Sequence, residues 1–497
     1  MMAATSWRDL QASHDSGRSV AEARAAQVSW GRRPLRERLR VIRRTRHRIA
    51  EAADAIASVL DGGRSRAPGE TLTAEVIPLA DACRFLEKSA ARILAPRHLG
   101  LRGRPLWLPG YRGQVRREPL GVVLVIGPSN YPLFLPGVQA LQALAAGNAA
   151  VLKPGRGGSA AALALADCLT AAGLHSGLCP VLEESPEAAE RAIEAGIDKV
   201  VLTGSIQTGR AVLTKLAPRV VPATMELSGC DAAFILEDAD VALAARALLY
   251  GLRLNGGATC ISPRRAFVAR AIADELEGLL RDMIGAQEPI RVEEDTAQRL
   301  RPLVADALAG GARLVAGRVD DLEVTGPIIL ADLSPEMRVT QEDVMAPILS
   351  LLPVPDMQEA LEASLRCPCA LGASMFGPEK AALQMAGRVR AGVVVVNDMI
   401  VPTADPRVPF GGRGRSGFGT TRGAEGLLEM TAAKAVLIRR GRWRPHLNRQ
   451  GPALAQLATD YLATVHGRSA PRRAGALIRM VRGLRAAAKA SAEDPRD

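Results

Sequence analysis

The segment Asn255–Pro263, NGGATCISP, holds the residue best suited to nucleophilic chemistry. Cys260 lies there in a glycine-rich loop, between a helical pattern at Ala242–Leu252 and an apolar run at Ala266–Val268. Loops of this kind place side chains against ligands. A thiolate is a strong nucleophile near neutral pH, and adjacent backbone N–H groups can bind an oxyanion. Because free cysteines are usually buried and inert, the loop alone leaves a structural cysteine as the alternative.

The composition is that of a folded protein with more than one domain. The 497 residues exceed one ordinary core, and 48% of them are hydrophobic against 23% charged. No apolar run approaches the ~20 residues of a membrane span, and the N-terminus has no signal-peptide core. Seven cysteines without a CxxC pair predict a cytoplasmic protein without disulfides. Cys367 and Cys369 flank one proline, which is not metal-ligand spacing, so we expect no metal.

Positive charge is concentrated at the C-terminus. The net charge is +12, and residues 439–497 hold 13 Lys and Arg against 4 Asp and Glu. The remainder is close to neutral, which argues against nucleic-acid binding by the folded body. Amphipathic patterns at Leu454–Val465 and Leu477–Leu484 predict surface helices or disorder. This tail could attach to an acidic surface, although a merely solvated tail is the favoured interpretation.

The N-terminal part predicts helices followed by an extended ribbon. Residues 1–33 are polar and without apolar periodicity, so we expect them to be loose. Apolar residues recur at helical spacing from Leu35 to Ile56, before a stop signal at Asp61-Gly62-Gly63. A second helix is predicted at Thr71–Leu94, and His98–Glu118 has the composition of an extended ribbon.

From Gly121 onward, strands and helices alternate, which predicts a parallel sheet with helices on both faces. Ligands bind at the carboxyl ends of such strands, where the loops Pro128–Tyr131, Pro154–Arg156 and Gly204–Gly209 lie. We therefore predict an α/β protein with two Rossmann-like doubly wound domains and a small β arm. The predicted strands are Gly121–Ile126, Ala149–Lys153, Lys199–Leu202, Ala312–Ala316, Ile348–Pro353, Ala373–Phe376 and Val393–Asn397. The predicted helices are Gly137–Ala146, Ser159–Ala172, one from Gly209, Ala271–Met283, Ala297–Leu308 and Met357–Arg366.

Six segments in order carry a resemblance to a known family. They read PLGVVLVIGPSNYP, LAAGNAAVLKPG, VVLTGSIQTG, MELSGCD, NGGATC and VPFGGRGRSGFG. From about Glu118 to Leu437 the chain thus resembles the aldehyde dehydrogenase superfamily. The spacing from Glu226 to Cys260, and that from Asn130 to Lys153, is also similar to the family's usual spacing.

The resemblance implies a covalent mechanism. Cys260 would attack an aldehyde, and the Asn130 amide with the Cys260 backbone N–H would hold the oxyanion. Hydride transfer to a nicotinamide would leave a thioester. Glu226 would be the general base that activates a water to hydrolyse it. No histidine lies between His175 and His446, which counts against a Cys-His hydrolase.

The resemblance also implies an NAD(P) site without a GxGxxG fingerprint. Gly204 and Ser205 would open a helix, including Gly209, whose N-terminus meets the pyrophosphate. Lys153 would bind the adenine-side ribose, and Ser129 belongs to the same site. In NAD-preferring relatives a Glu follows in KPxE; here it is Arg156, which can bind a 2′-phosphate through two N–H···O bonds. We predict that NADP is accepted and preferred over NAD; the alternative is that Arg156 points to solvent.

Several positions depart from the family pattern. Asp343 stands where a Glu would hold the nicotinamide ribose, unless a one-residue shift uses Glu342, and Met345 replaces Phe. These changes affect cofactor affinity more than the nucleophile, base or oxyanion donor. Other departures are Ser129 for Trp, Ala258 for Gln, Cys230 for Lys, and Leu182-Glu183-Glu184-Ser185 for a Gly-containing loop.

The predicted function is oxidation of an aldehyde to a carboxylic acid, with NAD or NADP as acceptor, by a homodimer or homotetramer. One alternative is a coenzyme A-acylating enzyme, against which Glu226 argues because acylating relatives often lack that carboxylate. Another is a decayed scaffold on the same fold, against which the intact Cys260, Glu226 and Asn130 argue. The predicted domains are residues 1–97, 119–228 and 409–428 for cofactor binding, 229–408 for catalysis, 98–118 and 429–440 for the oligomerisation arm, and 441–497 for the basic tail.

Overall fold

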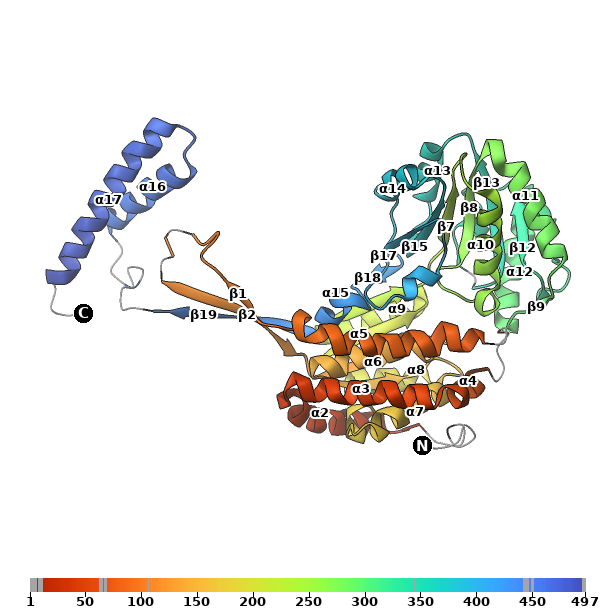
Figure 1. Ribbon diagram of the computed structural model, residues 1–497, viewed down its shortest axis with the longest axis horizontal. Helices are drawn as coiled ribbons and strands as arrows, with labels where there is room; N and C mark the ends of the chain where they lie inside the picture. The colour runs from red at the N-terminus through yellow and green to blue at the C-terminus, as the bar shows by residue number, and fades with distance from the viewer. Residues whose placement is uncertain are drawn as a thin grey trace. The chain divides into compact units, whose positions relative to one another are not determined.

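The computed structural model describes residues 7, 12–61, 66, 69–105, 107–108, 110–343, 345–440, 447 and 451–493. The chain forms two compact units, Met1–His98 with Gln114–Ala435 and Leu99–Gly113 with Val436–Asp497. The first unit holds two α/β sheets, each with helices packed against it (Figure 1). The predicted α/β fold class is therefore confirmed.

The first sheet has five strands in the order β18-β6-β5-β3-β4. Its four long strands run parallel, and β18 pairs antiparallel with β6. β3 and β4 are buried along their whole length, as continuous apolar runs predict for strands covered on both faces. The strands are β3 (Val122–Ile126), β4 (Ala149–Lys153), β5 (Lys199–Gly204), β6 (Ala223–Leu227) and β18 (Gly417–Phe418). The helices that alternate with them are α6 (Phe134–Ala146), α7 (Ser159–Ala171), α8 (Pro186–Glu194) and α9 (Ile206–Leu216).

The second sheet has seven strands in the order β10-β12-β13-β8-β7-β15-β16, all parallel except the antiparallel edge strand β10. The strands are β7 (Asp231–Ile235), β8 (Pro263–Ala269), β10 (Arg313–Ala316), β12 (Ile328–Ala331), β13 (Ile348–Val354), β15 (Gly372–Phe376) and β16 (Val393–Val396). The helices are α10 (Val241–Arg253), α11 (Arg270–Gly285), α12 (Glu294–Ala309), α13 (Met357–Ser364) and α14 (Glu379–Ala386).

Alternation along β7 shows how this sheet is covered on both faces. Ala233 and Ile235 pack in a core with residues of α10 and α11. Ala232 and Phe234 pack in a separate core with residues of α13 and α14. Because successive strand residues point to opposite faces, one short apolar strand serves two helical layers.

The prediction that residues 1–33 are loose was wrong for residues 16–32, while residues 1–6 and 8–11 lie outside the described part of the chain. Ser16–Arg32 form helix α2, whose N-cap Asp15 accepts a hydrogen bond from the Arg18 N–H. Trp30 is buried, and its Nε1 donates to the Leu144 carbonyl oxygen of α6 at 2.9 Å. The polar sequence hid this helix because its contact surface consists of a few residues that find partners far along the chain.

The predicted helices that follow are divided. The first becomes α3 (Leu35–Glu51) and α4 (Ala53–Asp61), and the second becomes a π-helical turn, η1 (Leu72–Val76), and α5 (Ile77–Ile93). Pro78 lies directly after the π-helical turn, at the point where η1 continues into α5.

The predicted ribbon is a three-stranded sheet in the order β1-β2-β19. Its strands are β1 (Arg97–Leu99), β2 (Tyr111–Pro119) and β19 (Thr431–Arg439). β19 lies at one edge of this sheet, and its Leu437 and Ile438 are 61% and 51% exposed.

The second unit contains a helical hairpin of α16 (Pro452–His466) and α17 (Ala470–Glu493). Both amphipathic patterns predicted in the tail are therefore helical. Arg479 of α17 and Asp460 of α16 form an ion pair with an N–O distance of 2.7 Å. No helix in the described part of the chain is long and apolar enough to cross a bilayer.

Candidate active site

A cleft of about 980 Å³ opens where the strands of the first sheet end. Its lining includes the last residues of β3, β4, β5 and β6, which is the edge where parallel sheets bind ligands. Nearly all the residues predicted from the sequence meet there. They are Ser129, Asn130, Lys153, Arg156, Gly204, Ser205, Glu226, Cys260, Asp343 and Met345.

Gly209 lies apart from the lining of this cleft. A Cβ atom at this position would stand 2.8 Å from the Leu227 methyl groups. The glycine therefore lets α9 pack closely against β6, and its contact with the cofactor stays a prediction.

The loop before Cys260 owes its shape to three consecutive residues in the left-handed region. Asn255, Gly256 and Gly257 have φ values of 53°, 63° and 79°. Asn and Gly are the residues that adopt this region most readily. A Cβ at position 257 would also meet the Pro347 nitrogen at 2.5 Å. The NGG sequence is thus required by the backbone path that presents Cys260.

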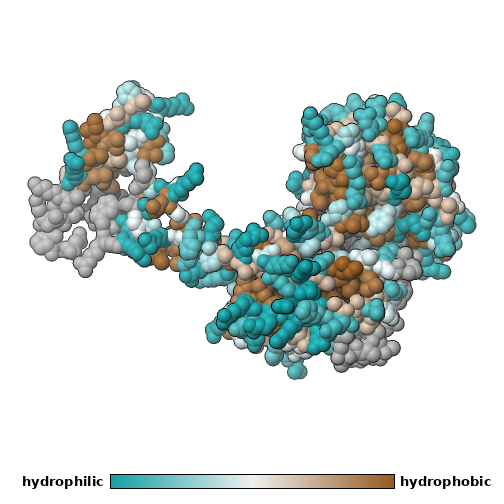
Figure 2. Space-filling view, viewed as in Figure 1, coloured by the Kyte–Doolittle hydropathy of each residue, from teal (hydrophilic) through white to brown (hydrophobic). Residues whose placement is uncertain are grey.

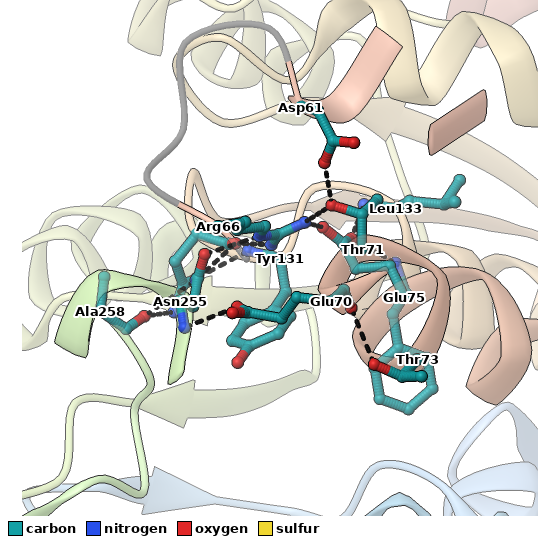
Figure 3. A network of polar contacts seen from close by, with 12 residues as sticks. Asp61, Arg66, Glu70, Thr71, Thr73, Glu75, Tyr131, Leu133, Asn255 and Ala258 are labelled. Carbon is teal, nitrogen blue, oxygen red and sulfur yellow. Dashed lines mark hydrogen bonds and ion pairs between the residues drawn. The ribbon is translucent and has the colours of Figure 1, made fainter. Parts of the chain in front are cut away.

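A buried ion pair ties this loop to the segment that carries Asn130 (Figure 3). The side chains of Arg66 and Glu75 are 1% and 0% exposed, and their N–O distance is 2.7 Å. Arg66 donates to the Asn255 Oδ1 at 2.8 Å and to the Asn130 carbonyl at 2.9 Å. The second Glu75 oxygen accepts the Leu133 N–H at 2.8 Å, just before α6. One guanidinium therefore fixes the segment that carries Asn130 and the loop before Cys260 relative to each other.

Further hydrogen bonds connect the same two segments. The Asn130 Nδ2 donates to the Ala258 carbonyl at 2.7 Å, and the Tyr131 and Thr259 hydroxyls are 2.6 Å apart. An amide nitrogen has two hydrogens, so Asn130 retains one donor while it holds the loop. The two residues that precede Cys260 are thus held by hydrogen bonds to the Asn130 segment.

Cys260 is the one cysteine of the seven, all of which lie in the described part of the chain, that is not buried. Its surroundings nevertheless raise the pKa of the thiol, mainly through burial and also through the Glu226 and Asp231 carboxylates, while Arg422 opposes the shift. The thiol is therefore protonated at neutral pH in this state. A base must remove its proton before it can act as a nucleophile.

Glu226 lies on β6 and is 2% exposed. Its Oε2 accepts a hydrogen bond from the Thr421 hydroxyl at 3.1 Å, and its Oε1 has no partner within the described structure. Burial raises the pKa of this carboxyl, against the opposing effects of Arg422 and Thr421. A carboxyl with a raised pKa is suited to accept a proton near neutral pH.

Arg422 supplies a buried positive charge near this thiol and carboxyl. Its guanidinium carbon lies 4.2 Å from the centroid of the Phe410 ring, and its Nη1 donates to the Thr403 carbonyl at 2.6 Å. Its φ of 60° is unusual for a bulky residue. Burial lowers the pKa of Arg422, but the group stays charged because arginine starts so high.

The cofactor side of the cleft holds a cation and a helix N-terminus. Lys153 is 8% exposed, and burial lowers its pKa while Glu184 and Glu187 oppose the shift. Ser205 caps α9, with its hydroxyl accepting the Thr208 N–H at 3.0 Å. The other free N–H groups of this first turn favour an anion such as pyrophosphate.

Glu184, from the segment that departs from the family pattern, caps α7. Its carboxylate accepts the backbone N–H groups of Gly157 and Ser159 at 2.7 and 2.8 Å. A negative charge therefore lies next to the loop between Lys153 and α7. Sequence reasoning did not include this charge, which would oppose a 2′-phosphate if one were bound beside that loop.

Arg156 does not simply point to solvent. Its side chain is 70% exposed, and it forms ion pairs with Asp295 at 2.7 Å and Glu293 at 3.1 Å. Exposed pairs of this kind contribute only about 0–1 kcal/mol, so the guanidinium can exchange them for another anion.

Asp343 and Glu342 differ in what they can hold. Asp343 is ion-paired with Arg264 at 3.1 Å, and burial raises its pKa against the effect of that arginine. Its Oδ2 has no partner within the described structure, which fits a hydroxyl donor such as a ribose. Glu342 is exposed and binds Arg338. Both residues line the cleft, and Asp343 offers the better-positioned acceptor.

The family model of the aldehyde dehydrogenases matches this chain over residues 6–436. The chain belongs to the aldehyde dehydrogenase family. The 4,4′-diapolycopene aldehyde oxidase of a Methylomonas species is 31% identical over 433 residues, which cover 85% of this chain and 81% of that protein. A putative NADP-dependent succinate-semialdehyde dehydrogenase of Mycobacterium ulcerans is 31% identical, covering 85% and 84% of the two chains.

The fold is shared with solved aldehyde dehydrogenases. The NADP complex of an NADP-dependent glyceraldehyde-3-phosphate dehydrogenase from Bacillus halodurans superposes with a TM-score of 0.79 and 28% identity, covering 85% of this chain and 91% of that one. This aldehyde dehydrogenase is thus an oxidoreductase that oxidises an aldehyde with NAD or NADP as acceptor.

Sequence reasoning missed several residues of this aldehyde dehydrogenase site. They are Arg66, Glu75 and Arg422. No motif or periodicity distinguishes them, because their partners lie far away along the chain. Asn255 is the exception: an Asn before two glycines is a signal for left-handed backbone that the sequence did offer.

Loss of the Arg66 side chain is expected to uncouple the two segments. Arg66→Met leaves Glu75 as an uncompensated buried charge, which typically costs about 3–5 kcal/mol of folding stability. The variant also loses the hydrogen bonds that connect the Asn130 segment with the loop before Cys260. We therefore expect kcat/KM to fall by at least ~10-fold. Thermal unfolding and initial rates measure the two effects.

Arg46→Met is the matched control, since Arg46 pairs with Glu87 at 2.7 Å on α3 and α5. It is expected to lower stability with little effect on kcat/KM. If Arg66→Met retained full kcat/KM at a temperature where it is folded, Arg66 would have no positioning role.

Proposed function

We propose that Cys260 is the nucleophile, Glu226 the general base and Asn130 an oxyanion donor of aldehyde oxidation. The observation that carries this proposal is that all three side chains line one cleft, with the Glu226 Oε1 left without a partner in the described structure. A buried acceptor without a hydrogen bond is costly unless another molecule uses it. An attacking water or the thiol proton would occupy it.

The reaction follows from these groups. Glu226 takes the Cys260 proton, the sulfur bonds to the aldehyde carbon, and the oxygen becomes an oxyanion held by Asn130 and the Cys260 N–H. NAD(P), when bound, accepts the hydride that leaves this carbon. Glu226 first releases the thiol proton to solvent. It then removes a proton from water, whose oxygen attacks the resulting thioester, and this proton returns to the Cys260 sulfur as that sulfur leaves. The carbon–sulfur bond breaks, the acid departs, and Cys260 is regenerated.

The remaining cleft residues would hold the cofactor. The α9 N-terminus, with Gly204 and Ser205, would bind the pyrophosphate, and Lys153 the adenine-side ribose. The free Asp343 oxygen would accept a hydroxyl of the nicotinamide ribose, and Ser129 and Met345 would contact the same molecule. The orphaned Asp343 acceptor and the helix N-terminus support this fit.

The test of the function is oxidation of an aldehyde panel with NAD and NADP, followed by the absorbance of reduced nicotinamide. Apolar polyene, ω-carboxylate and phosphorylated aldehydes represent the classes named for the relatives. We expect at least one class to be oxidised to the free acid. A product that appears only when coenzyme A is added would instead indicate an acylating enzyme.

NADP is proposed as the preferred acceptor because of Arg156. A charge-assisted bond to phosphate contributes roughly 1.5–3 kcal/mol, whereas its exposed pairs with Glu293 and Asp295 contribute less. Arg156→Glu is therefore expected to shift the NADP:NAD ratio of kcat/KM by at least ~10-fold toward NAD. Initial rates with both cofactors at fixed low salt measure this ratio.

Arg210→Glu is the matched control for Arg156. Arg210 lines the same cleft from α9, so its reversal changes the same net charge at another place. We expect a smaller change in the ratio. A wild type that strongly prefers NAD, with no change on Arg156→Glu, would contradict the proposal and indicate that Glu184 controls the choice.

Assembly into a dimer or tetramer through β19 is also proposed. An edge strand with exposed Leu437 and Ile438 is an aggregation hazard unless another strand covers it. Truncation after Thr431 is expected to cause dissociation or insolubility, whereas truncation after Gln450 should preserve the oligomer. Light scattering distinguishes these outcomes, and loss of the oligomer in the shorter truncation would assign assembly to the helical hairpin.

The cytoplasm is the proposed compartment. All seven cysteines, each in the described part of the chain, are free. Thiols persist in reducing compartments, where disulfides are rare.

A further inference from the structure

The α16–α17 hairpin presents an apolar stripe along one side of α17, next to the face that packs against α16. Leu477, Val481 and Leu484 follow one another at helical spacing and are 45%, 38% and 42% exposed. Ile478, beside them, is 53% exposed. Figure 2 shows apolar residues gathered over this hairpin among polar ones.

A different face of α17 is already used for packing against α16. Ala476 is fully buried, a Cβ at Gly483 would meet the Leu457 methyl at 2.8 Å, and Arg479 pairs with Asp460. The apolar stripe is therefore not needed to hold the hairpin together. It covers no other part of the described hairpin.

Arginines border this stripe, and negative charge is absent around it. On a helical projection, Arg473 lies beside Leu484 on one side, and Arg485 and Arg482 lie beside Ile478 on the other. From residue 461 to residue 492 the sequence has no Asp or Glu. An apolar stripe between arginines, on a helix too charged to span a bilayer, is the pattern of a helix that lies in a membrane interface.

We propose that the α16–α17 hairpin binds the surface of membranes that contain anionic phospholipids. The stripe would enter the boundary between headgroups and acyl chains, and the arginines would contact the phosphates while their stems cover apolar surface. A second copy of this chain is a poorer occupant, because self-pairing of the face brings equal positive charges together. The family match ends at residue 436, so the hairpin is an addition to the enzyme fold.

The test is sedimentation of the full-length protein with vesicles, one set of phosphatidylcholine and one with about a third of phosphatidylglycerol. We expect binding to the anionic set, at least ~10-fold weaker binding to the neutral set, and weaker binding as salt rises above physiological strength. Binding to neither set, or equal binding to both, would overturn the proposal.

Two variants separate the parts of the surface. The triple exchange Leu477→Ser, Val481→Ser, Leu484→Ser removes the stripe, and Arg473→Gln, Arg482→Gln, Arg485→Gln removes the bordering charges. Each is expected to weaken binding to anionic vesicles by at least ~10-fold with aldehyde oxidation unchanged. Unchanged binding in both would overturn the proposal. If a triple variant does not fold, truncation after Gln450 replaces it as the test, because it removes the whole hairpin and should abolish vesicle binding.

A matched control removes three exposed arginines from α3 by Arg36→Gln, Arg40→Gln and Arg43→Gln. It should retain binding, and an equal loss would show that overall charge alone attracts the protein. If the serine variant lowers the oligomeric state instead of vesicle binding, the stripe is a subunit interface. If added RNA displaces the vesicles, and RNA binding is lost in the arginine variant but not in the serine variant, the hairpin binds nucleic acid. Either of these two results would overturn the proposal.

Discussion

Cys260→Ala is expected to abolish aldehyde oxidation while NAD(P) binding survives. The change removes the sulfur that forms the bond to substrate, and loss of a nucleophile commonly lowers turnover by on the order of 10⁴-fold or more. The cofactor groups at Lys153 and on α9 are untouched, so fluorescence titration with NADPH should give nearly the wild-type Kd. Initial rates and this titration together separate loss of chemistry from loss of folding.

Cys369→Ala is the matched control, because Cys369 lines the same cleft but belongs to a buried group with Cys230 and Cys367. We expect it to retain most of the activity. If Cys260→Ala turned over at near wild-type rate, the covalent mechanism would be excluded. If only Cys369→Ala were inactive, Cys369 and not Cys260 would be the nucleophile.

Glu226→Gln is expected to stop the reaction after the first half. Gln keeps the shape of the side chain but cannot take a proton from water, and loss of a general base typically costs ~10²–10⁴-fold. Gln also cannot deprotonate Cys260, so the first half should slow, but alkaline pH supplies thiolate directly. Under those conditions we expect a burst of reduced cofactor, slow turnover, and a protein-bound acyl group that mass spectrometry detects.

The pH profile gives a second measure of Glu226. Burial raises the pKa of this carboxyl, and only its ionised form is a base. Activity of the wild type should therefore rise as pH increases through that raised pKa, and the acid limb should be changed in Glu226→Gln. Steady-state turnover at full speed in the variant, at any pH, would remove Glu226 from the mechanism.

The sequence by itself determined the fold class, and it led to the proposed reacting groups. Continuous, short, β-branched apolar runs such as Val122–Ile126 indicate strands covered on both faces, since an exposed face would need polar residues. The order of the motifs resembles that of the aldehyde dehydrogenases, and this resemblance implied that Asn130, Glu226 and Cys260 act in aldehyde oxidation. The backbone conformation of Asn255-Gly256-Gly257 is also predictable from the residue types, because few other residues adopt left-handed φ values at three successive positions.

Tertiary structure decided what surrounds these groups. Arg66 reaches Asn255 across 189 positions of the chain, and no local pattern encodes a contact at that separation. The same reason explains why helix α2 was missed, since Trp30 finds its partner only in the folded molecule. Arg156 reads as a free phosphate ligand in the sequence, yet it meets two carboxylates at the start of α12. Local sequence preferences determine strands and turns. The pKa values and the hydrogen-bond partners of the side chains depend on burial and on distant charges, which exist only after the chain has folded.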